Sequence, residues 1–159
     1  MLSYITVGAN DVPLSGSFYT AILTPLGYEK KEAADAVEFT SPDVPDRASG
    51  PGAVYVKKPY DGEEATVGNG SMTAFQAGTH EMVRDLHAAG LQAGGSDEGA
   101  PGFRDEYSDR FYVGYLRDPL GNKVALFCAN PAEGTRPLNS AEAPRVGADG
   151  TSQRLLRPI

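Results

Sequence analysis

The sequence contains few of the residues on which several classes of protein depend. It has a single cysteine, Cys128, among 159 residues, which excludes an internal disulfide and a zinc site built from thiolates. Its 14 basic side chains are outnumbered by 21 acidic ones, giving a net charge of −7, so we expect no binding to nucleic acid. No run of about 18 apolar residues occurs, so we expect no contact with a membrane through a spanning helix.

The N-terminal residues lack the features of a secretion signal. No basic segment precedes the first apolar run, and no cleavage site of small residues follows it. We therefore expect a cytoplasmic protein.

The overall composition is that of a globular domain that turns often. Apolar residues at 40% and charged residues at 22% are ordinary proportions, which excludes wholesale disorder. Gly and Pro together supply 31 of the 159 residues. This richness in turn-forming residues favours strands and loops over a bundle of long helices.

Aromatic residues are missing from the last part of the chain. All 8 Tyr and 6 Phe lie before residue 130, and few bulky side chains follow. Such a segment cannot bury enough apolar surface to fold alone. We predict one domain over residues 1–130 and a C-terminal extension over residues 131–159, which is either loose or docked as an arm.

The pattern of apolar residues predicts the same order of elements twice. An offset of 68 residues pairs Tyr4 with Met72 and Tyr19 with His87. We predict strands at residues 2–8, 28–33, 36–40 and 53–58 with a helix at 12–25 in the first half. In the second half we predict strands at residues 71–77, 91–94, 110–117 and 123–128 with a helix at 79–90 and a long loop after residue 94.

Two βαβββ modules, at about residues 1–60 and 68–130, account most simply for this order. The predicted fold class is α+β, with both modules forming a curved mixed sheet. Because a helix covers only one face of each module's strands, the opposite faces can curve around a cavity. A small ligand would bind there.

Three short motifs resemble those of the vicinal oxygen chelate superfamily, which includes glyoxalase I, bleomycin-resistance proteins and extradiol dioxygenases. The resemblance covers residues 1–130, and it implies a homodimer because relatives often pair modules between chains. The motifs are Tyr4-Ile5-Thr6-Val7 with Asn10-Asp11 and Phe18-Tyr19, Gly68-Asn69-Gly70, and Asp118-Pro119-Leu120-Gly121-Asn122-Lys123-Val124.

The resemblance also implies where a metal would bind, since catalytic members hold one divalent cation with His, Glu or Gln side chains from both modules. It places these ligands at Tyr4, Met72 and Ala125 of this chain. A phenol is a rare ligand, a thioether is soft and a methyl group has no donor atom. The only histidines, His80 and His87, fall on the second helix, where we interpret His87 as a packing residue. We therefore expect no metal and no other cofactor.

The residues that we expect to line the cavity are mostly small or aromatic, which favours an apolar or planar ligand. A segment at residues 97–107 combines Gly with aromatic residues, as cavity lids often do; the alternative is a solvated surface loop. If it folds over the cavity, its side chains would bind an anionic or phenolic ligand. The predicted ligand-binding residues are Tyr4, Thr6, Tyr55, Met72, Ala74, Tyr112, Ala125 and Phe127, with Arg104 and Tyr107 from the segment.

These observations favour a protein that binds a small organic molecule without metal-dependent catalysis, in the manner of the bleomycin-resistance branch. The sequence identifies no catalytic residue and leaves open whether the protein is an enzyme. One alternative is a metal-dependent lyase, isomerase or dioxygenase of the same superfamily, with a relocated site that includes Glu38 or a tyrosine. Another is a fold retained as a dimerisation or scaffold module.

Overall fold

The computed structural model describes residues 2–41 and 52–137. Within these ranges the chain forms two modules, each with one α-helix and four strands. The first consists of β1 (Tyr4–Gly8), α1 (Val12–Leu23), the short 3-10 helix η1 (Thr24–Leu26), β2 (Glu29–Ala33), β3 (Ala36–Thr40) and β4 (Ala53–Lys57). The second consists of β5 (Met72–Gln76), α2 (His80–Gln92), β6 (Ser96–Phe103), β7 (Tyr112–Arg117) and β8 (Lys123–Cys128).

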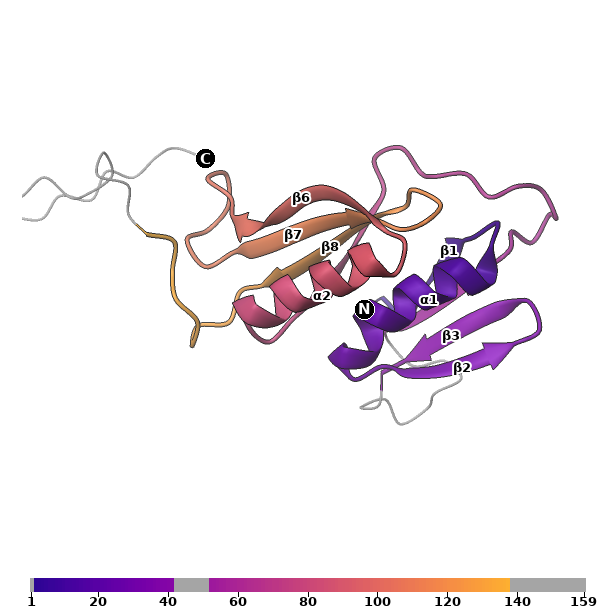
Figure 1. Cartoon of the computed structure of the whole chain (residues 1–159), viewed down its shortest axis with the longest axis horizontal. Helices are drawn as coiled ribbons and strands as arrows, with labels where there is room; N and C mark the ends of the chain where they lie inside the picture. The colour runs from indigo at the N-terminus through magenta and orange to yellow at the C-terminus, as the bar shows by residue number, and fades with distance from the viewer. Residues whose placement is uncertain (1, 42–51, 138–159) are drawn as a thin grey trace, which may run out of the picture.

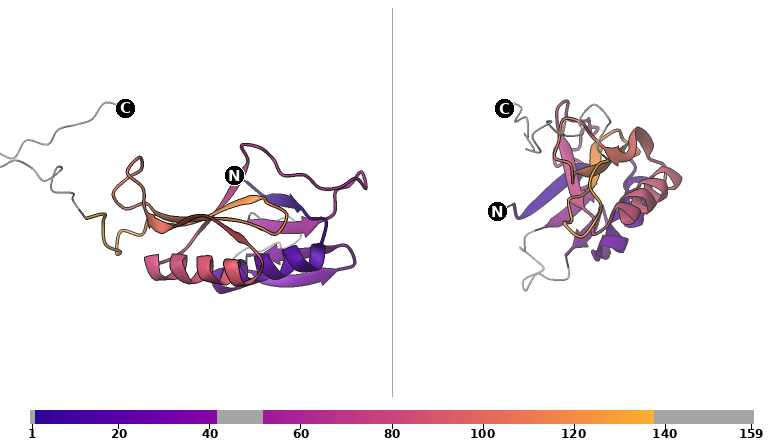
Figure 2. Two further views of the ribbon diagram at one scale, coloured as in Figure 1. Left: turned by 45° about the horizontal axis from the view of Figure 1, so that its top comes forward. Right: turned by 90° about the vertical axis from the view of Figure 1, so that its left-hand side faces the viewer.

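The strands of each module form a mixed four-stranded sheet. Their order is β1-β4-β3-β2 in the first sheet and β5-β8-β7-β6 in the second. β1 is parallel to β4 and β5 is parallel to β8, whereas the other neighbours are antiparallel. Both α-helices lie on one side of the sheets (Figure 1 and Figure 2). The predicted α+β fold of two βαβββ modules is confirmed.

Both α-helices begin where their capping residues predict. The Asp11 carboxylate accepts a hydrogen bond from the Leu14 amide at 2.9 Å, and the Thr79 hydroxyl accepts one from the Met82 amide at 3.0 Å. These caps satisfy amide donors that the first helical turn leaves free. No helix among the described residues is long and apolar enough to cross a membrane.

The strand predicted at residues 91–94 is wrong, because these residues complete α2 and the turn after it. The strand is β6, where the sequence suggested a loop. Its pairing with β7 shifts register on both sides of Gly99, and such bulges disrupt the alternation by which a strand is identified. Gly99 has a φ of 153°, which residues with a side chain rarely adopt. The predicted lid is therefore a strand up to Phe103 and a loop only from residue 104 onwards.

The two modules share one hydrophobic core. α1 packs against α2 at Gly90, where a β-carbon would lie 2.6 Å from a methyl group of Leu116 and 3.2 Å from the ring of Phe18. Buried side chains from both modules form a single cluster. The modules are therefore one packed unit.

A buried carboxylate also joins the modules. Asp118, which is 3% exposed, opens the turn between β7 and β8 and accepts hydrogen bonds from the three backbone amides of residues 120–122. Its second oxygen accepts from the Tyr19 hydroxyl at 3.1 Å and from Asn122 Nδ2 at 2.8 Å. Asn122 Nδ2 also donates to the carbonyl of Gly8. The second module's hairpin thus holds both α1 and β1 of the first module.

The first residues of the predicted C-terminal extension contact the second module. Glu133 accepts a hydrogen bond from the His80 amide at the start of α2, at 3.1 Å, and Arg136 forms an ion pair with Asp105 at 2.6 Å. Arg110 donates to a backbone carbonyl of the extension at 2.9 Å. The remaining residues of the extension, 138–159, lie outside the described part, so the domain division near residue 130 and the docking of the whole arm stay predictions.

Candidate ligand-binding face

Alternate side chains of the strands point to the side of the sheets opposite the α-helices, which we call the open face. In the first sheet, Thr6 of β1, Tyr55 of β4 and Glu38 of β3 lie side by side in register. Tyr4 is 58% exposed, and its ring meets that of Tyr55 edge-on with the centroids 5.6 Å apart. The open face includes Tyr4, Thr6, Lys31, Glu38, Tyr55 and Lys57 in the first sheet, and Met72, Ala74, Val113, Tyr115, Arg117, Lys123, Ala125 and Phe127 in the second.

Small residues form a row across the open face of the second sheet. Ala74 of β5 pairs with Ala125 of β8, which pairs with Tyr115 of β7. Met72, on the same face, is 49% exposed, but Ala125 is only 2% exposed. Larger neighbours therefore already close over Ala125, and Ala74 is the small residue of the row that solvent reaches.

The loop after β6 folds back onto this face. The Phe111 ring stacks on Phe127 of β8, with centroids 5.3 Å apart and an interplanar angle of 24°. Tyr107 packs against Phe111 at 4.9 Å and remains 54% exposed. The loop thus brings two aromatic rings to the open face, one of which is the predicted Tyr107.

Cationic side chains surround Tyr115 at the centre of the second sheet. The Arg104 guanidinium lies 5.4 Å from the centroid of the Tyr115 ring, and the Lys123 ammonium lies 5.1 Å from it. Burial, followed by the charge and hydrogen bond of Tyr107, raises the pKa of Tyr115. Glu98 is held by Arg117 through two hydrogen bonds of 2.9 and 2.7 Å, and this pairing lowers the pKa of Glu98.

Tyr112 is the one predicted ligand-binding residue that the structure places on the other side of the sheet. It alternates with Tyr115 along β7, so its side chain faces α2. Its ring stacks on His80 at 4.4 Å, and its hydroxyl accepts a hydrogen bond from Arg84 at 3.4 Å. Tyr112 is therefore part of the packing between α2 and β7.

Several residues of the site, with Tyr115 and Lys123 at its centre, are not among those predicted from the sequence. A signal for both was present, because the hairpin at residues 118–122 fixes the register of the strands on either side. Counting back from that turn pairs Tyr115 with Ala125, which the sequence had already placed on the cavity side. Lys123 follows from the strand after the hairpin, where it alternates with Ala125 and Phe127 on the same face.

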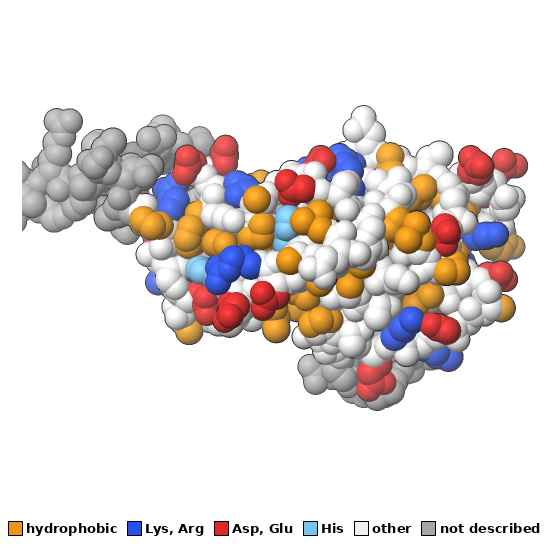
Figure 3. Space-filling model, in the orientation of Figure 1, with side chains coloured by type: hydrophobic (Ala, Val, Ile, Leu, Met, Phe, Trp, Pro, Cys, Tyr) orange, Lys and Arg blue, Asp and Glu red, His pale blue; other side chains and the backbone are white. Residues whose placement is uncertain are grey.

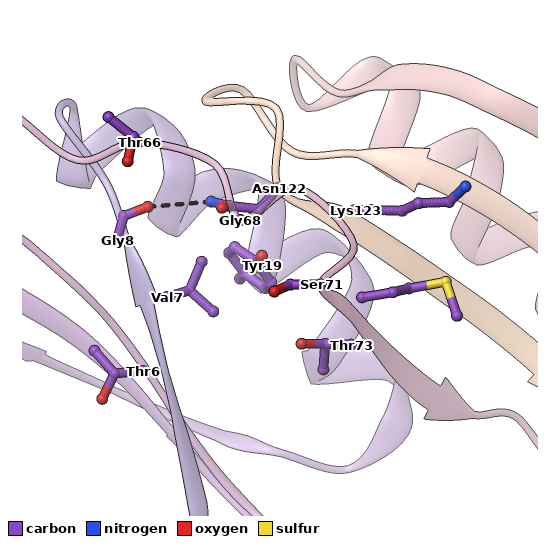
Figure 4. Close-up of a pocket in the computed structure, with 11 residues that line it drawn as sticks. Thr6, Val7, Gly8, Tyr19, Thr66, Gly68, Ser71, Thr73, Asn122 and Lys123 are labelled. Atoms are coloured by element: carbon purple, nitrogen blue, oxygen red, sulfur yellow. Dashed lines mark hydrogen bonds between the residues drawn. The ribbon is translucent and has the colours of Figure 1, made fainter.

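A pocket of about 230 Å³ lies between the first strands of the two modules. Thr66, Ser71 and Thr73 line it with hydroxyl groups, while the Lys123 ammonium points away from Val7 and Tyr19 (Figure 4). Of the predicted residues, it brings together only Thr6 and Met72. The residues that line the pocket are Thr6, Val7, Gly8, Tyr19, Thr66, Gly68, Ser71, Met72, Thr73, Asn122 and Lys123.

The side chains on the open face do not fit the divalent metal that the resemblance implies. Tyr4, Met72 and Ala125 offer one phenol, one thioether and one methyl group, and Ala125 is buried. Glu38 lies 3.9 Å from the ammonium of Lys31, which is a cation and not a second ligand. Among residues 2–41 and 52–137, no three His, Cys, Asp or Glu side chains come together as a metal-binding group.

His87 is buried on α2 and hydrogen bonded, which confirms its interpretation as a packing residue. Its Nε2 lies 3.1 Å from Asp97 Oδ1 and 3.2 Å from the carbonyl oxygen of Tyr115. Both partners belong to strands that α2 covers, so His87 links the helix to the sheet.

Comparison with known proteins agrees with this architecture. No protein-family model and no curated protein matches the chain. Among solved structures, a glyoxalase/bleomycin resistance protein from Albidiferax ferrireducens is 37% identical, with a TM-score of 0.69 over 80% of this chain and 98% of that one.

Two more distant structures share the fold. A glyoxalase-related enzyme from Fulvimarina pelagi is 17% identical over 98% of this chain and 99% of its own, with a TM-score of 0.61. A glyoxalase/bleomycin resistance protein/dioxygenase family enzyme from Burkholderia phytofirmans is 16% identical over 80% and 97%, with a TM-score of 0.58. Because this chain is 37% identical to the Albidiferax protein over nearly the whole of that protein, it belongs to the glyoxalase/bleomycin resistance family of the vicinal oxygen chelate superfamily.

Proposed function

We propose that the protein binds a small organic molecule on its open face, without a catalytic divalent metal. The main support is the exposure of large apolar side chains there: Tyr4, Met72 and Tyr107 are 58%, 49% and 54% exposed. Apolar groups gathered on one face are typical of a surface that a ligand or a partner covers. The proposal also agrees with the donor atoms on this face, which suit van der Waals and aromatic contacts better than metal coordination.

We also propose that a second copy of the chain covers part of the open face. Sites for small molecules bury most of the ligand surface, whereas one open face contacts a ligand from one side only. The open face of a second chain would supply the missing wall, and the homodimer would hide the exposed rings. The molar mass in solution, measured by light scattering during size-exclusion chromatography, tests this; a strict monomer at all concentrations would contradict it.

The metal-dependent lyase, isomerase or dioxygenase is a weaker candidate, because the described residues bring no suitable donor set together. A dimerisation or scaffold module without a ligand differs from our proposal in one measurable respect. It predicts that no small molecule perturbs the open face.

A fragment screen followed by amide NMR tests the binding proposal. Aromatic and heteroaromatic fragments should shift the amide resonances of β5, β7 and β8. Ala74→Trp should abolish these shifts, because the indole would occupy the accessible part of the row of small residues. Ala88→Trp is the matched control, since Ala88 is exposed on α2, on the other side of the sheet.

The outcome separates the two functions. Fragment-induced shifts on the open face that disappear only in Ala74→Trp would support ligand binding. A library that leaves these resonances unchanged, or shifts that persist in Ala74→Trp, would refute it.

A further inference from the structure

The charge on the open face of the second sheet differs from that of the whole protein. The chain carries a net charge of −7, yet three cations, Arg104, Arg117 and Lys123, lie around Tyr115 and the strand next to it. Glu98 pairs with Arg117 and lies 3.6 Å from Lys123. The charge of a second carboxylate, Glu106, acts on Tyr115. The cluster therefore has an excess of positive charge in a protein with an excess of negative charge.

Arg104 differs from the other two cations in how its charge is neutralised, because Arg117 and Lys123 share the Glu98 carboxylate. Arg117 forms a two-point ion pair with Glu98 and donates a further hydrogen bond to the Gly121 carbonyl. Arg104 donates to the backbone carbonyls of Ala100 and Phe103, and in the described part of the chain it forms no ion pair. A guanidinium has five N–H donors, so Arg104 keeps donors available for an anion.

Flat apolar surface lies next to these cations. Ala74 leaves space on β5, and the stacked rings of Phe111 and Phe127 stand beside it. The charged ends of Arg104 and Lys123 lie 5.4 and 5.1 Å from the Tyr115 ring, and Tyr115 pairs with Ala125. Ala125 is two residues, or about 7 Å, from Phe127 along β8, so one planar bicyclic molecule can reach from the phenylalanine rings to these cations. Such a molecule would gain ring contacts at one end and ionic contacts at the other.

We propose that the open face of the second sheet selects a planar aromatic carboxylate, with the ring against Phe111 and Phe127 and the carboxylate at Arg104 and Lys123. This inference rests on the proposed binding function and specifies its ligand class. A neutral aromatic would forgo the ionic contacts, and an aromatic cation would be repelled by both side chains.

Three probes with the same ring test the selection: 2-naphthoate, 2-naphthamide and 2-naphthylmethylammonium. Amide NMR titrations should give 2-naphthoate about tenfold tighter binding than 2-naphthamide, because hydrogen bonds to a charged group are the stronger ones. The ammonium probe should bind most weakly. Equal affinities of the three probes would refute the anion selectivity while leaving the proposed binding function intact.

Variants locate the effect. Lys123→Met and Arg104→Gln should each reduce the preference for 2-naphthoate over 2-naphthamide at least threefold, or about 0.7 kcal/mol. Lys123→Met should keep the fold, because Glu98 stays paired with Arg117. It therefore tests the proposal even if Arg104→Gln loosens the loop. Arg84→Gln removes the same charge from the helix-covered side, where acidic and basic side chains are intermixed (Figure 3), and should change nothing.

Each remaining outcome is also decisive. A loss in Arg84→Gln equal to that in Lys123→Met would overturn the proposed contacts, because it would indicate a general effect of net charge. If none of the naphthalene probes binds but other fragments shift the open face, this inference fails and the proposed function stands. If the wider fragment screen also leaves the face unchanged, the proposed function fails with it.

Discussion

Removing the Asp118 carboxylate should destabilise the protein far more than removing any one of its partners. The carboxylate is buried and accepts hydrogen bonds from three backbone amides, from Tyr19 and from Asn122. Asp118→Ala therefore deprives five donors of their acceptor at once. Tyr19→Phe deletes only one of these hydrogen bonds and leaves the other four in place.

The burial of the donors sets the size of the effect. Water can reach the partly buried amides of the turn after small movements, but the Tyr19 side chain is almost completely buried. Removing the acceptor of a buried donor costs about 1–3 kcal/mol per donor, and partial rehydration reduces the sum. We expect Asp118→Ala to lower the free energy of unfolding by about 3–5 kcal/mol, as for other substitutions that break a buried hydrogen-bond network. Tyr19→Phe should lower it by about 1.5 kcal/mol.

Urea unfolding followed by circular dichroism measures both values. Tyr60→Phe is the control, because Tyr60 is fully exposed and its hydroxyl should contribute nothing. A cost below about 1 kcal/mol for Asp118→Ala, or equal costs for Asp118→Ala and Tyr19→Phe, would refute the idea that this carboxylate holds the modules together.

Four further predictions concern pH, the extension and metal. Burial, followed by the Asp118 charge, raises the pKa of Tyr19. Above pH 10 the phenol ionises in the unfolded chain but not in the folded one, so the wild type should lose about 1.4 kcal/mol more stability per pH unit than Tyr19→Phe. Equal losses of stability for the two proteins in urea unfolding at pH 10 and pH 11 would contradict this. Arg117→Gln should raise the pKa of Glu98 towards its ordinary value, as a carboxyl NMR titration would show, and an unmoved pKa would mean that Arg117 is not what lowers it. A chain ending at residue 129 should melt at a lower temperature than one ending at residue 137, because only the shorter one loses the Glu133 and Arg136 contacts; identical melting curves would make the extension passive. After incubation with Mn, Fe, Ni or Zn and dialysis, elemental analysis should find no stoichiometric metal, whereas retention of one ion per chain would favour the metal-dependent alternative.

The sequence predicted those parts of the fold that depend on short-range patterns. Helix caps at Asp11 and Thr79 and regular alternation in β1, β3 and β8 are local signals, and each element formed where it was expected. β6 carried no such signal, because its glycines and its register shifts interrupt the alternation. β6 forms because the backbone of β7 offers it hydrogen-bond partners, and backbone hydrogen bonds do not depend on the side chains of the strand.

The residues of the site were predictable where the strand phase was known. Tyr4 and Tyr55 were expected on one face, and their rings are in contact. The phase of β7 becomes clear only when it is counted back from the hairpin that follows the strand, and this phase places Tyr115 on the open face and Tyr112 against α2. The contact between Tyr19 and Asp118 joins residues 99 positions apart in the sequence, and the periodicity of a single strand or helix cannot predict a contact between residues so far apart.

Two polar residues at equivalent positions of the internal repeat are buried on the helices. Tyr19 and His87 occupy equivalent positions, 68 residues apart, and each lies next to a carboxylate of the second module: Tyr19 donates to Asp118, and His87 lies 3.1 Å from Asp97. A buried polar side chain is tolerated when it has a hydrogen-bond partner, so these two need no ligand to account for them. The open face has no such repeated pairing, since Tyr4 and Met72 are equivalent in position yet unrelated in chemistry. The two modules therefore share the side of the strands that builds the core and differ on the side proposed to bind a ligand.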